Sequence, residues 1–212
     1  MEGPTNDVKA LDARLSEERL QLVDYTAFFG SLPEALRAKV TQRWGPPERD
    51  PFYRPGELDC GAFRIPVARF GNVAVGVQPA RGYNIDPQAS YHDPDLVPPH
   101  SYLACYGWLR RGFDADAVIH LGKHGNLEWL PGKALALSEA CYPEAVLGPL
   151  PHLYPFIVND PGEGTQAKRR SAAGTPSSGA MPQSALKPAA AACSRIVLAR
   201  YGSRRGSSAA AS

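Results

Sequence analysis

The apolar residues of the first half of the chain follow a helical spacing before they change to a strand-like one. Between Lys9 and Phe29 they recur every three or four positions with charged residues between them, which predicts an amphipathic helix. A second helix is expected from about Ser31, because Ser31-Leu32-Pro33-Glu34 has the spacing of a capping box with a proline near the first turn. The sequence Trp44-Gly45-Pro46-Pro47 should end it.

Further along, short β-branched runs alternate with helical spacing. Asn72 to Gln78 and Ala115 to Leu121 predict buried strands, and Ser101 to Arg111 between them predicts a helix. Phe156 to Val158 would form a third strand, followed by a turn and a helix from about Glu163. This alternation predicts an α/β fold with a parallel or mixed sheet and flanking helices.

Composition divides the chain into three parts. We expect an N-terminal helical segment over residues 1–45, an α/β core over residues 46–170 and a low-complexity tail over residues 171–212. The tail has 12 Ala, 9 Ser, five Lys or Arg and no Asp or Glu. Two interpretations stay open: a disordered interaction arm, or out-of-frame translation of a GC-rich gene, which yields such residues.

Charge and hydropathy exclude several classes of function. Without the tail, 18 basic residues face 21 acidic ones, so the body offers no basic face for nucleic acid. No apolar run approaches the roughly 18 residues of a membrane span, and the start MEGPTNDVKALDARL lacks the features of a secretory signal. These features predict a cytoplasmic protein without a membrane role. The four cysteines form no C-x-x-C pair and are expected to be reduced.

The stretch IHLGKHGNLEWLPGK, from Ile119 to Lys133, carries the candidate chemistry. In one continuous helix, His120, His124 and Glu128 would share a face and form a plausible ligand row for zinc or a similar ion. Each glycine in the stretch would cost about 1 kcal/mol there, so a strand ending at His120 and a glycine-rich loop are favoured. Such a loop lies beyond the carboxyl end of a strand, where open α/β sheets bind ligands.

A structural role for these residues is the alternative. His120 would then be a hydrogen-bonded buried histidine, and Glu128 would only stabilise a turn. Two known motifs are absent: the spacing does not match the zincin pattern H-E-x-x-H, and Leu130 to Ala134 lacks the glycine spacing and the Ser or Thr of a phosphate loop. We therefore expect no ATP site in this segment.

Four longer stretches resemble a known family. They are GVQPARGYNIDP (Gly76 to Pro87), YHDPDLVPPH (Tyr91 to His100), HLGKHGNLEWLPGKALALS (His120 to Ser138) and GPLPHLYPFIVNDPGEGTQAKRR (Gly148 to Arg170). They closely resemble the large subunit of aerobic cobaltochelatase, the CobN type, and more distantly the large H subunit of magnesium chelatase. Asn126 and Trp129 favour the cobalt type, whose motif reads HGNLEWLPGK where the magnesium type tends to read HGxLEFxPGK.

The resemblance implies ATP-dependent insertion of Co²⁺, as a substrate, into hydrogenobyrinic acid a,c-diamide in aerobic cobalamin biosynthesis. In the family this subunit binds the corrinoid or tetrapyrrole and the metal. ATP and Mg²⁺ bind to two smaller AAA+ motor subunits, which agrees with the absent phosphate loop. Insertion of Mg²⁺ into protoporphyrin IX is the alternative that the magnesium relatives imply.

The same resemblance suggests roles for residues. Imidazole and carboxylate groups suit Co²⁺ handling and proton removal, so Glu128 is expected to act as base or metal relay, with His120 and His124 as metal-handling groups. Donors to the carboxylate-rich macrocycle are expected near the loop. The candidates for substrate binding are Arg81, Tyr83, Asn84, Lys123 and Lys133. A second cluster, His92, Asp93 and Asp95, is equally well explained as a turn, and His100 and His152 beside prolines are expected to be structural.

The family's chains are several times longer than this one, so the sequence is interpreted as a truncated piece of a larger multidomain chain. On its own, such a piece is expected to be inactive and poorly soluble. A non-catalytic remnant or a tetrapyrrole-binding fragment therefore remains the third interpretation.

Overall fold

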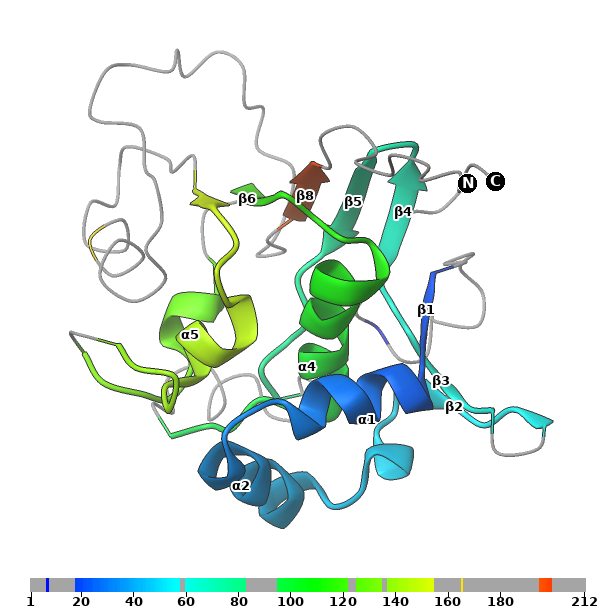
Figure 1. The fold of residues 1–212 in the computed structure, drawn as a ribbon, viewed down its shortest axis with the longest axis vertical. Coiled ribbons are helices and arrows are strands. Elements are labelled where there is room, and N and C mark those ends of the chain that lie inside the picture. The colour runs from blue at the N-terminus through cyan, green and yellow to red at the C-terminus, as the bar shows by residue number, and fades with distance from the viewer. Residues whose placement is uncertain are drawn as a thin grey trace, which may run out of the picture.

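The computed structural model describes residues 7, 18–57, 60–82, 95–121, 125–134, 137–154 and 165, together with the backbone of Arg195–Ala199. These residues form two sheets and a set of helices packed against them (Figure 1). The smaller sheet has the strand order β1-β3-β2, and the larger one β4-β5-β8-β6-β7. The mixed α/β character predicted from the sequence is confirmed.

The elements have the following bounds. The strands are β1 (Arg19–Gln21), β2 (Tyr53–Arg54), β3 (Ala62–Arg64), β4 (Val67–Phe70), β5 (Val73–Val77), β6 (Ala117–Leu121), β7 (His152–Leu153) and β8 (Arg195–Ala199). The α-helices are α1 (Leu22–Gly30), α2 (Glu34–Trp44), α4 (His100–Gly107) and α5 (Tyr142–Leu147). Single turns of other helix types are η1 (Pro47–Arg49), η3 (Trp108–Gly112, a π-helix) and η4 (Leu127–Trp129).

The direction of the strands in the larger sheet determines where their ends meet. β4 pairs antiparallel with β5, β8 pairs antiparallel with both β5 and β6, and β6 pairs parallel with β7. It follows that β5, β6 and β7 all run in one direction, although β8 separates the first two. The chain therefore leaves these three strands at the same edge of the sheet.

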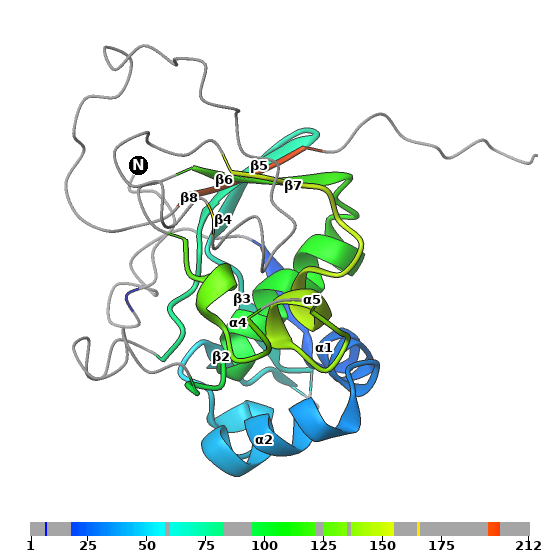
Figure 2. The ribbon, with the colours of Figure 1, turned by 90° about the vertical axis from the view of Figure 1, so that its left-hand side faces the viewer.

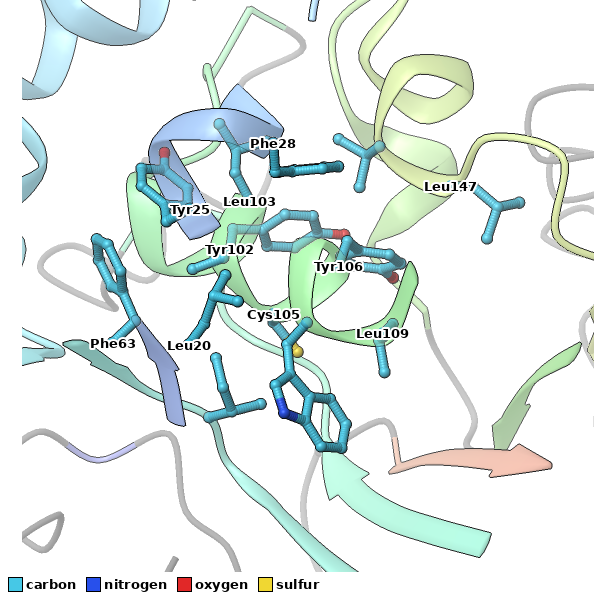
Figure 3. Packing of buried hydrophobic residues seen from close by; sticks show 14 of the residues in the cluster. Leu20, Tyr25, Phe28, Phe63, Tyr102, Leu103, Cys105, Tyr106, Leu109 and Leu147 are labelled. Atoms are coloured by element: carbon cyan, nitrogen blue, oxygen red, sulfur yellow. The ribbon is translucent and has the colours of Figure 1, made fainter. Parts of the chain in front are cut away.

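Helices cover one face of this sheet (Figure 2). α4 lies at the centre of the packing, and every one of its residues is buried. Figure 3 shows α4 and η3 side chains, including Leu103 and Leu109, beside Tyr25 and Phe28 of α1. All four of these side chains are at most 1% exposed. Their burial, worth about 1.5–3 kcal/mol per large apolar side chain, holds α1 and α4 together.

One predicted helix is largely wrong. Within Lys9 to Phe29, the structure has strand β1 at Arg19–Gln21 and a helix only from Leu22. Leu20 lies opposite Phe63 of β3, and both are buried. Pairing with a strand more than 40 residues away thus overrides the local helical spacing. Val23, counted in the apolar stripe, is 73% exposed.

The second helix is confirmed, but its predicted cap is wrong. α2 spans Glu34–Trp44, with Pro33 at the N-cap and no side-chain cap. The Ser31 hydroxyl instead donates to the carbonyl of Phe28, which terminates the preceding helix. Ser31 therefore belongs to the end of α1 and not to the start of α2.

The other predictions have mixed outcomes. β5, β6 and the combination of α4 with η3 agree with three predicted elements to within two residues, although β6 ends at Leu121 and not at His120. The predicted strand at Phe156 to Val158, and all of the helix from Glu163 except Thr165, lie outside the described residues.

Residues 171–212 were expected to be disordered, and β8 does not fit that expectation. Its sequence RIVLA is rich in β-branched residues, and the structure pairs it between β5 and β6. For the rest of the tail, disorder stays a prediction, as do the three proposed domain boundaries.

Candidate active site

The candidate site lies at the edge where β5, β6 and β7 end. Gln78 follows β5, Gly125 to Trp129 follow β6 after the three-residue segment 122–124, and Tyr154 follows β7. Ligands in open α/β sheets bind beyond the carboxyl ends of strands, so this convergence places the Glu128 segment where binding is expected.

Glu128 is the buried acid of this site. It lies in the single turn η4, and its side chain is 0% exposed. Gly125 approaches the carboxylate closely: a Cβ atom at Gly125 would stand 2.9 Å from Oε2 and 3.0 Å from Oε1. Two phenols of α4, Tyr102 and Tyr106, are near enough for the Glu128 charge to raise the pKa of both.

Burial is the larger cause of these phenol shifts. It holds the pKa of Tyr102 well above its ordinary value, and the neighbouring Tyr106 and Glu128 add to the effect, while Arg81 opposes it. The same desolvation raises the pKa of Tyr106. Both phenols are therefore neutral hydrogen-bonding groups at physiological pH.

A network of amide and phenol groups surrounds the turn that carries Glu128. The Asn126 amide N–H donates to Gln78 Oε1 at 3.0 Å, and Asn126 Nδ2 donates to the carbonyl of Pro79 at 2.9 Å. Tyr102 donates to Asn126 Oδ1 at 2.8 Å, and Gln78 Nε2 donates to the Tyr106 hydroxyl at 3.0 Å. These contacts join the end of β5, helix α4 and the turn.

His120 lies inside this network and does not face solvent. It is 0% exposed, its Nε2 is 3.3 Å from the Tyr106 hydroxyl and its Nδ1 is 3.0 Å from His152 Nε2. Burial first, and the neighbouring His152 second, hold the pKa of His120 well below its ordinary value. The imidazole is therefore neutral, with both nitrogens engaged, as the structural alternative from the sequence describes.

His152 and Tyr154 complete the far side of the pair. The His152 ring lies 4.4 Å from that of His120, measured between centroids, and stacks on Tyr154 at 6.2 Å. The Tyr154 hydroxyl accepts a hydrogen bond from the backbone N–H of Gly125 at 2.6 Å. The segment after β7 thus also holds the loop after β6, and the expected structural role of His152 agrees with this geometry.

The predicted substrate-binding residues divide into two groups. Tyr83, Asn84 and Lys123 lie outside the described residues, as does His124 among the predicted metal ligands. Arg81 is only 9% exposed, and its Nη1 donates to the backbone carbonyl of Trp129 at 2.6 Å. Lys133 is exposed, and its backbone N–H donates to Cys141 Sγ at 3.3 Å.

The remaining histidine and acid predictions are also placed in part. His92 and Asp93 lie outside the described residues, and Asp95 is exposed. His100 is buried at the start of α4, where its Nε2 donates to the carbonyl of Gly45 and its Nδ1 accepts from the Tyr25 hydroxyl. The expectation of a structural His100 agrees with these contacts.

The metal site that the sequence predicts is not tested by this geometry. Among the described residues, no three His, Cys, Asp or Glu side chains come close enough together to hold a metal ion. The predicted set needs His124, which is outside that part of the chain. Of the set, His120 and Glu128 are both buried close to the same phenol, Tyr106.

Sequence reasoning missed the residues that hold the turn in place. Gln78, Tyr102, Tyr106 and Tyr154 were not predicted to be functional, yet they make most of the contacts above. One signal was available for two of them: Tyr102 and Tyr106 are four residues apart, so a helix places both hydroxyls on one face. No described helix is long and apolar enough to cross a membrane.

Comparison with known proteins agrees with the resemblance seen in the sequence. The model of the CobN/Magnesium Chelatase family matches residues 1–177. The chain belongs to this family. The family consists of metal chelatases, and the matched range contains the whole Glu128 site.

Its relatives include both metal types. The chain is 66% identical over 173 residues to the aerobic cobaltochelatase subunit CobN of a Sinorhizobium species, covering 82% of this chain and 13% of the relative. It is 57% identical over 171 residues to that of Pseudomonas aeruginosa, covering 81% of this chain and 13% of the relative. Identity to the magnesium-chelatase large chain of the H type from Chlorobaculum parvum is 46% over 140 residues, which covers 65% of this chain and 10% of the relative.

A solved structure has the same fold. The catalytic subunit of cobaltochelatase from Mycobacterium tuberculosis matches with a TM-score of 0.68 and 52% identity, over 74% of this chain and 14% of that one. This chain therefore spans about 13–14% of the length of its cobaltochelatase relatives.

Proposed function

We propose that this chain forms part of a cobaltochelatase large subunit and supplies the Glu128 site for insertion of Co²⁺ into a corrin ring. The observation that carries the proposal is the similarity to two cobaltochelatase subunits, at 66% and 57% identity, against 46% for a magnesium chelatase. The specific substrate would be hydrogenobyrinic acid a,c-diamide. The energy would come from ATP, bound with Mg²⁺ on two AAA+ partner subunits.

The chemistry of insertion fits a buried carboxylate. Two ring N–H bonds break, two Co–N bonds replace them in the macrocycle along with coordination by the other ring nitrogens, and two protons leave. Glu128 would accept one of these protons or hold the ion while its water is removed. A carboxylate enclosed by apolar and phenolic groups interacts strongly with a cation, because the surroundings screen charge weakly.

The histidines would act beside it. We propose that His124 and His120 handle the metal, as the resemblance implies. For His120 to coordinate an ion, one of its two contacts, to Tyr106 or to His152, would have to open. Without such a rearrangement its role is to hold Tyr106 and the strand end in place.

Substrate carboxylates and amides would be met by cationic and polar donors. Lys133 is exposed and able to reach a ligand, and Tyr83, Asn84 and Lys123 are proposed for the same role. Arg81 is proposed as well, although in this structure its guanidinium is directed to the Trp129 carbonyl.

Ring specificity is tested by tryptophan fluorescence. Of the three tryptophans, Trp108 is buried and Trp129, next to Glu128, is 40% exposed. We expect hydrogenobyrinic acid a,c-diamide to quench the emission more strongly than protoporphyrin IX does, and Trp129→Phe to remove most of the difference. Stronger quenching by the porphyrin would favour the magnesium-chelatase function, and no saturable quenching by either ring would favour a non-catalytic remnant.

Activity is tested in a chimera, because the relatives are much longer than this chain. Residues 1–170 of this chain replace the corresponding segment of the Sinorhizobium subunit, and Co²⁺ insertion is measured with ATP and the partner subunits. The proposal expects insertion at a rate close to that of the unchanged subunit. A folded chimera that binds the corrinoid but does not insert the metal would contradict it.

A further inference from the structure

The orientation of two side-chain amides near Glu128 follows from their partners. Pro79 offers a carbonyl oxygen, which only accepts, so the atom of Asn126 that faces it at 2.9 Å must be Nδ2. The backbone N–H of Asn126 only donates, so the atom of Gln78 that faces it at 3.0 Å must be Oε1.

The remaining atoms of the two amides then have defined partners. Asn126 Oδ1 accepts from Tyr102 at 2.8 Å, and Gln78 Nε2 donates to Tyr106 at 3.0 Å and more weakly to Tyr102 at 3.4 Å. Asn126 therefore makes hydrogen bonds through its backbone N–H, its Nδ2 and its Oδ1, and all three partners come from the segment that follows β5 or from α4.

A fourth contact holds the other end of the turn. Arg81, three residues beyond Gln78, donates to the carbonyl of Trp129 at 2.6 Å. The segment Gln78–Arg81 thus makes hydrogen bonds to the residue two positions before Glu128 and to the residue directly after it. These residues are mostly buried, so losing a contact would leave a polar atom that water cannot easily satisfy.

We infer that Gln78, Tyr102, Asn126 and Arg81 are positioning residues that fix the turn bearing Glu128 to β5 and α4, and so set where its carboxylate meets the metal. We call these four residues the clamp. This inference rests on the proposed function for its catalytic consequence, while the clamp itself concerns this chain alone. The four residues act through Glu128, and none of them needs to touch the ion.

Two phenols allow a matched test. Tyr102→Phe removes the hydrogen bond to Asn126 Oδ1, and Tyr142→Phe removes one of 2.9 Å to the carbonyl of Leu36, which joins α5 to α2. Both tyrosines are at most 1% exposed and each change deletes one oxygen atom. We expect both variants to unfold at a slightly lower Tm, because each loses one buried hydrogen bond.

Only the change at the clamp should affect metal insertion. In the Sinorhizobium chimera, we expect Tyr102→Phe and Asn126→Ala to lower kcat on the order of ten- to a hundredfold, with little change in the KM for the corrinoid, because a displacement of about 1 Å costs that much. Tyr142→Phe should leave kcat unchanged. In a Glu128→Gln background, Asn126→Ala should lower Tm as before but lower kcat no further.

A second measurement does not depend on activity. In this chain, Tyr102→Phe and Asn126→Ala should change the emission maximum and acrylamide quenching of Trp129, measured against the same variants carrying Trp129→Phe, and Tyr142→Phe should not. The inference is overturned if the clamp variants leave both kcat and Trp129 emission as Tyr142→Phe does. A chimera without insertion activity would contradict the proposed function, and the emission data would still decide on the clamp.

Discussion

Gly125 gives the most direct access to the position of the Glu128 carboxylate. Its φ is not in the positive range where only glycine is comfortable, so the backbone itself accepts alanine. The obstacle is the carboxylate, 2.9–3.0 Å from the place that the new Cβ would take. Gly125→Ala should therefore displace the end of a flexible side chain at little cost in stability.

The expected result of Gly125→Ala is a loss of metal insertion in the chimera of about tenfold or more, with a Tm close to that of the parent. Gly30→Ala is the control, since no atom lies within 4 Å of its new Cβ and it ends helix α1. A Gly125→Ala protein that inserts Co²⁺ at the parent rate would show that the carboxylate is not needed where the structure places it.

His100 makes stability depend on pH. Burial lowers its pKa below 6.5, more than the Gly45 carbonyl and the charges of Asp50 and Glu48 raise it. The folded protein therefore binds this proton less readily than the unfolded chain. The contribution of neutral His100 is complete above about pH 6.5 and is lost as the pH falls below that value toward the folded pKa.

We expect Tm to fall between about pH 7 and pH 5.5, and His100→Gln to show a smaller fall, because glutamine keeps one donor and one acceptor without titrating. His120 shifts in the same direction, so part of the dependence should remain. Thermal unfolding followed by circular dichroism checks this. An equal fall in the parent and the variant would mean that His100 does not contribute.

Helix α4 begins at a contact that local sequence does not reveal. Asp50 Oδ2 accepts the backbone N–H of Ser101 at 2.7 Å, and Oδ1 accepts that of Phe52 at 2.8 Å. The acid thus caps a buried helix from 51 residues away and also closes its own turn. Capping rules search the residues next to a helix, which is why no cap could be predicted for the Ser101 to Arg111 helix.

Removing this cap should destabilise the fold. Asp50→Ala leaves two buried N–H groups without their acceptor, for which we expect a loss of about 2 kcal/mol or more in the free energy of unfolding, and Asp50→Asn should lose less. Chemical denaturation measures the difference. Glu139→Gln, at an exposed acid, should change stability by less than about 0.5 kcal/mol, and an equally small effect at Asp50 would contradict the cap.

Elements with strong local patterns were predictable, and those made by distant pairing were not. β5, β6 and the core of α2 follow spacing and composition, and so their positions were found from their own residues. β1 depends on β3, and β8 depends on β5 and β6, so neither could be seen from its own segment. For the site, the motif identified Glu128 and His120, while the residues that hold them come from α4 and from the segments that follow β5 and β7.

At the scale of the molecule, the outer face of the larger sheet is apolar. On strands β4, β5, β6 and β7, the residues that alternate with the inward-facing set are all apolar, and several are exposed: Phe70, Val73, Leu121 and Leu153 are 37–66% exposed. Exposed apolar area of this kind usually marks an interaction surface or a risk of aggregation.

We therefore expect this chain to bind the dye ANS, and the double variant Phe70→Ser with Leu153→Ser to bind less of it without losing more than about 1 kcal/mol of stability. Dye titration and denaturation on the same samples provide the check. Unchanged dye binding would place the exposed apolar surface elsewhere on the chain.

The fold brings the ends of β5, β6 and β7 together, and we propose that it thereby presents Glu128 for metal insertion. The most direct measurement is the rate of Co²⁺ insertion by the chimera with and without Glu128→Gln, at equal corrinoid occupancy determined by fluorescence. We predict that the glutamine variant folds and binds the corrinoid but inserts the metal at least about a hundredfold more slowly. Insertion by Glu128→Gln at the parent rate would contradict this role of the carboxylate.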